Sequence, residues 1–212
     1  MYLIGLTGNI AAGKTTVCNI LRKLGAHIID ADALVHRLLA KGQPVYRQVV
    51  AAFGQDILTA NGEIDRARLG RLVFGNPEAL RRLEAIVHPA VAELVEQEIA
   101  ASTAAVIVVD AVKLIESGLS KRCNAVWVVT AREEQQFQRL TEKRGMSPQD
   151  ARQRIRAQEP QERKIALADV VIDNSGTEEE TEAQIVRAWQ RIPLFLSSDR
   201  EKPRGDEQSG NR

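Results

Sequence analysis

The chain has 212 residues, with 29 Lys and Arg against 28 Asp and Glu, and its formal net charge is +1 at pH 7. This length fits one large domain, or a core that carries insertions, and a hydrophobic content of 44% is enough for a sizeable core. The near-neutral charge excludes a mainly electrostatic nucleic-acid binder, and an aromatic content of 4% argues against a platform for base stacking.

Five short apolar runs, separated by longer stretches, have the pattern of buried strands. In chain order they are Tyr2–Thr7, His27–Asp30, Ala105–Asp110, Ala125–Thr130 and Asp169–Asp173. Strands that alternate with helical stretches are typical of a parallel sheet in an α/β protein. The sequence therefore predicts a five-stranded parallel sheet with helices packed around it.

The connection between the second and third predicted strands, residues 31–104, is far longer than a simple crossover needs. Its apolar residues recur at helical spacing, which predicts several helices. We expect them over Ala33–Ala40, Val45–Phe53, Arg66–Phe74 and from Asn76 onward, where Asn is a favourable N-cap before Pro. A helical insertion at the carboxyl end of a strand is well placed to wall a pocket over the sheet.

A second long connection, residues 131–167, is rich in arginine. Between Arg139 and Lys164 eight Lys and Arg residues face four Asp and Glu residues. A basic segment of this kind is expected to act as a lid that closes over phosphate groups. After Ile192 the periodicity is lost, and we expect a disordered tail over residues 193–212.

A phosphate-binding motif follows the first predicted strand. Residues 8–15 fit the pattern Gly-x-x-x-x-Gly-Lys-Ser/Thr and lie between a buried strand and an amphipathic helix. In such a loop, glycines let backbone N–H groups surround a phosphate at the N-terminus of the helix. Lys14 is expected to neutralise the β- and γ-phosphates, and the Thr15 hydroxyl to hold Mg²⁺.

The phosphate loop does not identify the acceptor of the phosphoryl group. The chain has no DxxG motif at residues 110–113 and no NKxD motif at residues 173–176, so a guanine-nucleotide switch is disfavoured. The helical insertion and the basic segment instead favour a small-molecule kinase. On the residues alone, the acceptor could be a nucleoside monophosphate or a sugar, and a nucleotide-binding module without catalysis is a further alternative.

Two aspartates follow the second predicted strand. Asp30 has the position of a helix N-cap. Asp32 is better placed to face the cleft beside the phosphate loop. A carboxylate there can accept the proton of an acceptor hydroxyl, a role typically worth ~10²–10⁴ in rate. On position alone, a capping role at the helix N-terminus is the alternative for Asp32 as well.

Taken together, these motifs resemble those of the dephospho-CoA kinase family, from Leu3 to about Trp189. Apart from the phosphate loop, the likeness depends on the following segments: Asp30-Ala31-Asp32, His88-Pro89, Asp110 with Leu114 and Glu116, Arg154-Ile155 with Gln158, and Ala168-Asp169 with Asn174 and Gly176. Two segments depart from the family pattern. Before Glu116 the family has Pro-Leu-Leu-Phe, whereas this chain has Val-Lys-Leu-Ile, and after Arg139-Leu140 the second basic position could be filled by Lys143 or Arg144.

The resemblance implies a three-layer P-loop kinase fold. Its nucleotide-binding core would consist of residues 1–30, 105–130 and 168–192, with a helical acceptor domain over 31–104 and the lid over 131–167. The implied reaction is ATP-dependent phosphorylation of the ribose 3′-hydroxyl of dephospho-CoA, which gives CoA and ADP in the last step of coenzyme A biosynthesis.

The resemblance also implies site residues. The expected catalytic residues are Asp32, Lys14 and Arg139. The expected ATP contacts are Gly8, Asn9, Ile10, Ala11, Ala12, Gly13, Lys14, Thr15, Thr16, Arg144, Asn174 and Gly176, with Thr15 as the Mg²⁺ ligand. The expected acceptor contacts are Asp32, His88, Leu114 and Glu116. Lys113, where the chain departs from the family pattern, is added as our own hypothesis, because it places a positive charge at the same pocket wall. For Lys113, pairing with an acceptor phosphate and a solvated side chain remain open, and for His88 a packing role is the alternative.

Several features bear on location and partners. No apolar run approaches the ~20 residues of a membrane span, and Met1–Thr7 lacks the basic segment of a signal peptide. Cys18 and Cys123 cannot form a disulfide framework. We therefore expect a cytoplasmic protein, monomeric or weakly homo-oligomeric, that binds small-molecule substrates and neither nucleic acid nor membrane.

Overall fold

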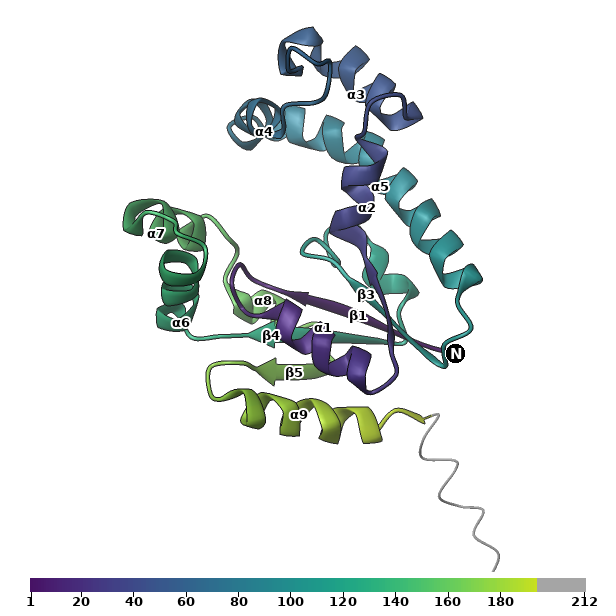
Figure 1. The fold of residues 1–212 in the computed structure, drawn as a ribbon, viewed down its shortest axis with the longest axis vertical. Coiled ribbons are helices and arrows are strands. Elements are labelled where there is room, and N and C mark those ends of the chain that lie inside the picture. Colours follow the sequence, from purple (N-terminus) through teal and green to yellow (C-terminus); the bar gives the residue numbers. More distant parts are fainter. Residues whose placement is uncertain (194–212) are drawn as a thin grey trace, which may run out of the picture.

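Five parallel strands form the central sheet of the computed structural model, which describes residues 1–193 (Figure 1). The strands are β1 (Tyr2–Gly8), β2 (His27–Asp30), β3 (Val106–Asp110), β4 (Ala125–Thr130) and β5 (Val170–Asp173). Their order across the sheet is β2-β3-β1-β4-β5, and every neighbouring pair is parallel. The predicted sheet is confirmed. The expected tail lies, apart from Pro193, outside the described residues.

Helices cover both faces of the sheet, because successive side chains of its inner strands point to opposite faces. On one face, Ile4 and Val108 pack in a cluster with residues of α1 (Lys14–Lys23) and α9 (Glu178–Gln190). On the other face, Leu3 and Ile107 pack in a cluster that includes residues of the long helix α5 (Pro77–Ala101). This helix–sheet–helix arrangement confirms the three-layer α/β fold.

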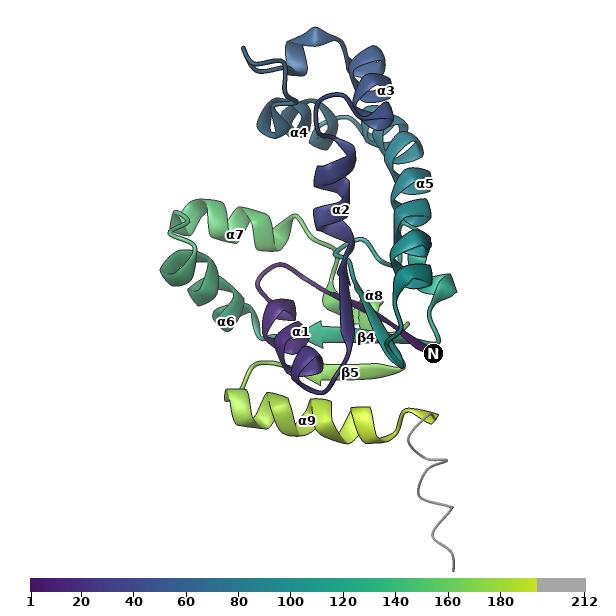
Figure 2. The same cartoon turned by 45° about the vertical axis from the view of Figure 1, so that its right-hand side comes forward.

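The insertion after β2 extends beyond the carboxyl edge of the sheet (Figures 1 and 2). It contains α2 (Ala31–Leu38), α3 (Pro44–Phe53), a 3₁₀ turn (Gln55–Ile57), α4 (Arg66–Phe74) and the N-terminal part of α5. Asn76 caps α5 by accepting the N–H groups of Glu78 and Ala79, as its sequence position predicts. Val91 and Val95 of α5 belong to the same apolar cluster as Val45 and Val49 of α3, so the insertion and the sheet share a core.

The basic segment after β4, which we call the predicted lid, is mostly helical. It contains α6 (Glu133–Gln138), a π-helical turn (Arg139–Lys143), α7 (Pro148–Arg156) and α8 (Gln161–Ile165). The buried side chains of Leu140 and Ala151 form a small apolar cluster with Ala11 of the phosphate loop. The predicted lid therefore has a core of its own that contacts the loop, and in Figure 2 α6 and α7 stand beside the loop region. Among the described residues, no helix is long and apolar enough to span a membrane.

Candidate active site

The phosphate loop connects β1 to α1 at the carboxyl edge of the sheet. Gly13 has φ +99°, a left-handed conformation that glycine adopts without strain. A Cβ atom on Gly13 would lie 1.9 Å from Asn174 Nδ2, and one on Gly8 would lie 2.5 Å from the carbonyl oxygen of Val129. At both positions a side chain would clash with a neighbouring segment. At Gly13 the left-handed backbone conformation also favours glycine.

Arg139 and Asn174 donate hydrogen bonds to carbonyl oxygens of the phosphate loop. The Arg139 guanidinium donates to the carbonyl oxygens of Ala11 at 3.0 Å, Ala12 at 2.9 Å and Asn174 at 2.6 Å. Asn174 Nδ2 also donates to the Ala12 carbonyl, at 2.8 Å. Because the carbonyl and N–H of a trans peptide point in opposite directions, these bonds turn the N–H of Gly13 away from Arg139.

These contacts show what Arg139 binds in this structure. Burial lowers the pKa of its guanidinium from the ordinary value, but arginine remains a cation under all ordinary conditions. Three carbonyl oxygens engage its fork, so Arg139 supports the phosphate loop in this structure, and its catalytic role stays a prediction. Asn174 is likewise a support of the loop, because its amide oxygen also accepts a hydrogen bond from the Thr181 hydroxyl at 3.0 Å.

Lys14 pairs with an aspartate that sequence analysis did not select as a site residue. Its Nζ lies 3.4 Å from Asp110 Oδ1, and the Cys18 thiol donates to Asp110 Oδ2 at 3.5 Å. Burial raises the pKa of the Asp110 carboxyl, and the positive charge of Lys14 opposes this effect. Asp110 ends β3, which pairs with β1. An acidic residue at the end of the third predicted strand was therefore the feature of the sequence that could have identified Asp110 as a partner of Lys14.

The two aspartates after β2 have different roles. Asp30 is the N-cap of α2 and accepts the N–H of Ala33 at 2.8 Å, which confirms the expected cap. Asp32, in the first turn of α2, accepts the N–H of Val112 at 3.4 Å and lines a cavity. The carboxylate of Asp32 therefore lies between the cavity and the segment that follows Asp110.

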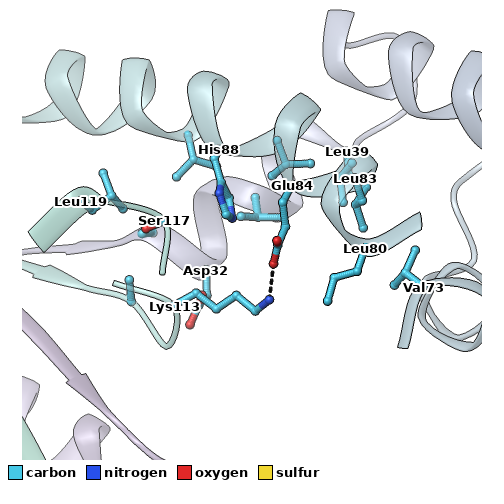
Figure 3. Close-up of a pocket in the computed structure, with 15 residues that line it drawn as sticks. Asp32, Leu39, Val73, Leu80, Leu83, Glu84, His88, Lys113, Ser117 and Leu119 are labelled. Carbon is cyan, nitrogen blue, oxygen red and sulfur yellow. Dashed lines mark hydrogen bonds and ion pairs between the residues drawn. The ribbon is translucent and has the colours of Figure 1, made fainter. Parts of the chain in front are cut away.

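This cavity has a volume of about 230 Å³ and lies between α2, α5 and the segment after β3 (Figure 3). Most of its lining is aliphatic; the polar or charged lining residues are Asp32, Glu84, His88, Lys113 and Ser117. Lys113 Nζ forms an ion pair with the Glu84 carboxylate, drawn as a dashed line in Figure 3. The site can thus hold a largely apolar group next to a carboxylate base.

Two predicted acceptor contacts do not lie in this cavity. Leu114 is fully buried in the core, where a Cβ atom on Gly5 would lie 2.7 Å from its Cδ2. The turn after β3 directs this side chain against Gly5 of β1, away from the cavity, and its predicted contact with the acceptor stays a prediction. Glu116 does not line the cavity either, and lies 3.5 Å from the ammonium of Lys164.

The remaining predicted ATP contacts differ in their surroundings, and residues of the predicted lid bind the loop directly. Gln158 Oε1 accepts the N–H of Ile10 at 2.8 Å, and Asn9 Nδ2 donates to the Glu159 carbonyl at 3.0 Å, so the predicted lid touches the loop. Thr15 is exposed and Thr16 partly buried in the first turn of α1, and Arg144 is exposed at the end of the π turn. At Gly176 a Cβ atom would lie 1.9 Å from Glu180 Oε2, which caps α9, so this glycine permits the cap.

The described residues contain no group of three or more His, Cys, Asp or Glu side chains that could hold a metal ion. A cation here would have to use phosphate oxygens with the Thr15 hydroxyl and a nearby carboxylate. Asp110 Oδ1 is buried and accepts no hydrogen bond within residues 1–193, although Lys14 lies near it. Such hard oxygen donors fit Mg²⁺, which is usually held by one or two carboxylates and substrate phosphates.

Comparison with known proteins gives consistent matches. The sequence profile of the dephospho-CoA kinase family matches residues 2–180. A dephospho-CoA kinase from Geobacter metallireducens is 50% identical over 192 residues, which cover 89% of this chain and 96% of that protein. Among solved structures, TT1252 from Thermus thermophilus has a TM-score of 0.79 and 34% identity, covering 89% of this chain and 95% of that one. A dephospho-CoA kinase from Campylobacter jejuni has a TM-score of 0.64 and 27% identity, covering 92% and 98%.

Proposed function

This chain belongs to the dephospho-CoA kinase family, and we propose that its site transfers the γ-phosphoryl group of ATP to dephospho-CoA with Asp32 as the general base. The products of this reaction, in which the ribose 3′-hydroxyl is phosphorylated, are CoA and ADP. The family assignment supplies the substrates, and the residues at the carboxyl edge of the sheet support how the reaction is carried out.

The observation that carries the proposal is the position of Asp32. It lines the apolar cavity and accepts the N–H of Val112, two residues after the aspartate that pairs with Lys14. A hydroxyl bound in the cavity would therefore lie between a carboxylate and the phosphate loop. Positioning of this kind, together with electrostatic stabilisation, provides most of the rate enhancement in phosphoryl transfer.

In this proposal the phosphate loop binds the donor. The N–H groups at the start of α1 and the ammonium of Lys14 neutralise the charge that spreads over the phosphoryl oxygens. Thr15 would hold Mg²⁺, with the carboxylate of Asp110 nearby, and the bound ion would neutralise charge on the phosphates. Asp32 accepts the proton of the acceptor hydroxyl as the oxygen attacks phosphorus.

The predicted lid would supply a further cation. The π turn over Arg139–Lys143 has i to i+5 spacing, so Arg144 lies one turn beyond Arg139. We therefore assign the second basic position to Arg144, with Lys143 as the alternative. Arginine suits this role because its planar fork grips a phosphate at two points.

The acceptor would enter the cavity between α2 and α5. Its aliphatic walls suit an uncharged, weakly polar part of dephospho-CoA, while His88 and Ser117 offer hydrogen bonds. Lys113, which pairs with Glu84 in this structure, is a cavity-lining cation that would meet the acceptor's phosphates. The expected domain boundaries, cytoplasmic location and monomeric or weakly homo-oligomeric state remain predictions.

The experiment that tests the function is turnover of Mg-ATP with dephospho-CoA, compared with AMP, CMP and gluconate as acceptors. Selective formation of CoA is the expected result. Transfer to another acceptor, with none to dephospho-CoA, would retain the donor site and overturn the proposed acceptor. The Asp32→Asn variant should bind ATP but lose transfer.

A further inference from the structure

One buried cation has no role in the site described so far. Lys164, in α8, is only 7% exposed, although lysine is almost never buried unless its ammonium is paired. Its Nζ donates to the carbonyl oxygen of Val112 at 2.9 Å and lies 3.5 Å from a carboxylate oxygen of Glu116. The hydrogen bond to Val112 is therefore the closer of the two contacts.

The peptide groups of Val112 connect Lys164 to the proposed base. The Val112 carbonyl accepts two hydrogen bonds, from Lys164 Nζ and, at 3.0 Å, from the Thr7 hydroxyl. The N–H of the same residue donates to Asp32 Oδ2 at 3.4 Å. The two bonds hold the peptide plane that follows Val112, and the Ala111 N–H donates to the Leu6 carbonyl at 3.0 Å. The N–H of Val112 lies between these anchored groups and faces the carboxylate from a restrained turn.

Pairing with Glu116 alone does not explain why Lys164 is buried. The Glu116 side chain is 40% exposed, so an ion pair with it could form at the surface without loss of solvation. Burial of an ammonium is unfavourable unless it gains hydrogen bonds in return. The Val112 carbonyl is a partner that a solvated lysine could not reach.

We propose that Lys164 is a positioning residue for phosphoryl transfer, which anchors Val112 so that the backbone N–H orients the carboxylate of Asp32 toward the acceptor hydroxyl. This inference rests on the proposed function. It also connects the predicted lid to the base, because Lys164 follows Gln158 and Glu159, which contact the phosphate loop. One short segment thus touches the donor loop and supports the base.

The test compares two substitutions in α8 that each remove one positive charge, Lys164→Met and Arg163→Met. Arg163 is the matched control, because it precedes Lys164 in α8 but is exposed and pairs only with Glu159, at 3.0 Å, among the contacts described for it. Lys164→Met is expected to lower kcat for CoA formation by about 10–100-fold, the size of effect that a small misplacement of a reacting group produces. The KM values for ATP and dephospho-CoA should change little, and Arg163→Met should match the unmodified protein.

Two further variants separate positioning from folding. Lys164→Arg keeps the cation and its donors, so it should retain much more kcat than Lys164→Met at comparable thermal stability. Thr7→Val removes the second donor to the same carbonyl without a change of side-chain shape, and should lower kcat in the same direction even if Lys164→Met does not fold.

The outcomes are distinct. A kcat for Lys164→Met equal to that of Arg163→Met, with normal turnover by the unmodified protein, would overturn the positioning role alone. Equal loss in folded Lys164→Met and Lys164→Arg would also overturn it. Absence of dephospho-CoA turnover by the unmodified protein would overturn the proposed function and this inference together.

Discussion

The ammonium of Lys14 and the carboxylate of Asp110 form an ion pair at 3.4 Å, across the carboxyl ends of the neighbouring strands β1 and β3. Both side chains are largely buried, with exposures of 16% and 17%. The pair holds the lysine of the phosphate loop in place and sets an oxygen donor beside the helix turn that carries Thr15. In the proposed reaction, this carboxylate and the Thr15 hydroxyl are the candidate ligands of the magnesium ion that accompanies ATP.

Asp110→Asn should weaken the response to magnesium. Loss of a carboxylate close to a metal ion typically reduces metal affinity by about 10–100-fold, so the Mg²⁺ concentration for half-maximal activity should rise by a similar factor. Titration of activity with Mg²⁺ at saturating ATP measures this half-maximal Mg²⁺ concentration. Cys18→Ala is the control, because it removes the thiol contact and leaves the carboxylate. An unchanged Mg²⁺ dependence in Asp110→Asn would exclude Asp110 from the metal site.

Asp30 and Asp32 provide a matched pair of substitutions two residues apart. Asp32→Asn should lower kcat by about 10²–10⁴, the usual contribution of a general base, with little change in stability. Asp30→Ala removes the N-cap of α2 and should lower the free energy of unfolding by about 1 kcal/mol, with kcat near that of the unmodified protein. Steady-state kinetics of both variants measure kcat, and urea denaturation measures the free energy of unfolding. A loss of kcat in Asp30→Ala and a loss of stability in Asp32→Asn would exchange their roles.

The ion pair between Glu84 and Lys113 should tune acceptor binding. Lys113 is 46% exposed and Glu84 27%, so the energies are those of a surface pair. Glu84→Gln frees the lysine for an acceptor phosphate and should lower the KM for dephospho-CoA by about two- to fivefold.

Lys113→Met should raise the same KM by a comparable factor, and neither variant should alter the KM for ATP. Initial rates at varied dephospho-CoA and saturating ATP distinguish the two substrates. If Lys113→Met leaves the acceptor KM unchanged, Lys113 is a solvated lysine whose only described partner is Glu84.

The two cysteines should resist thiol reagents in the folded protein. Burial raises the pKa of Cys18 to about 12 and that of Cys123 to about 11. A raised pKa means less thiolate at a given pH, and thiolate is the reactive form. At pH 8 iodoacetamide should therefore modify both residues slowly in buffer and rapidly in urea, as measured by mass spectrometry. Fast modification of Cys18 in buffer would show that the helix after the phosphate loop opens readily.

Features of the fold that depend on residues close together along the chain could be predicted from the sequence. The continuous apolar runs predicted all five strands, because strands covered on both faces need no polar alternation. The caps at Asp30 and Asn76 and the loop from Gly8 to Thr15 depend on residues a few positions apart. Local conformation follows from local sequence in such cases, so the caps of α2 and α5 were predicted correctly.

Contacts between distant segments were decided only by the tertiary structure. Asp110 meets Lys14 because β3 pairs with β1, and Lys113 meets Glu84 because α5 and the segment after β3 line the same cavity. Leu114 is buried under β1, although it is one residue from a cavity-lining lysine. Lys164 reaches a carbonyl 52 positions away. The sequence determined which elements form and where the phosphate loop begins, whereas the side chains that share the site depend on how the packed elements bring distant residues together.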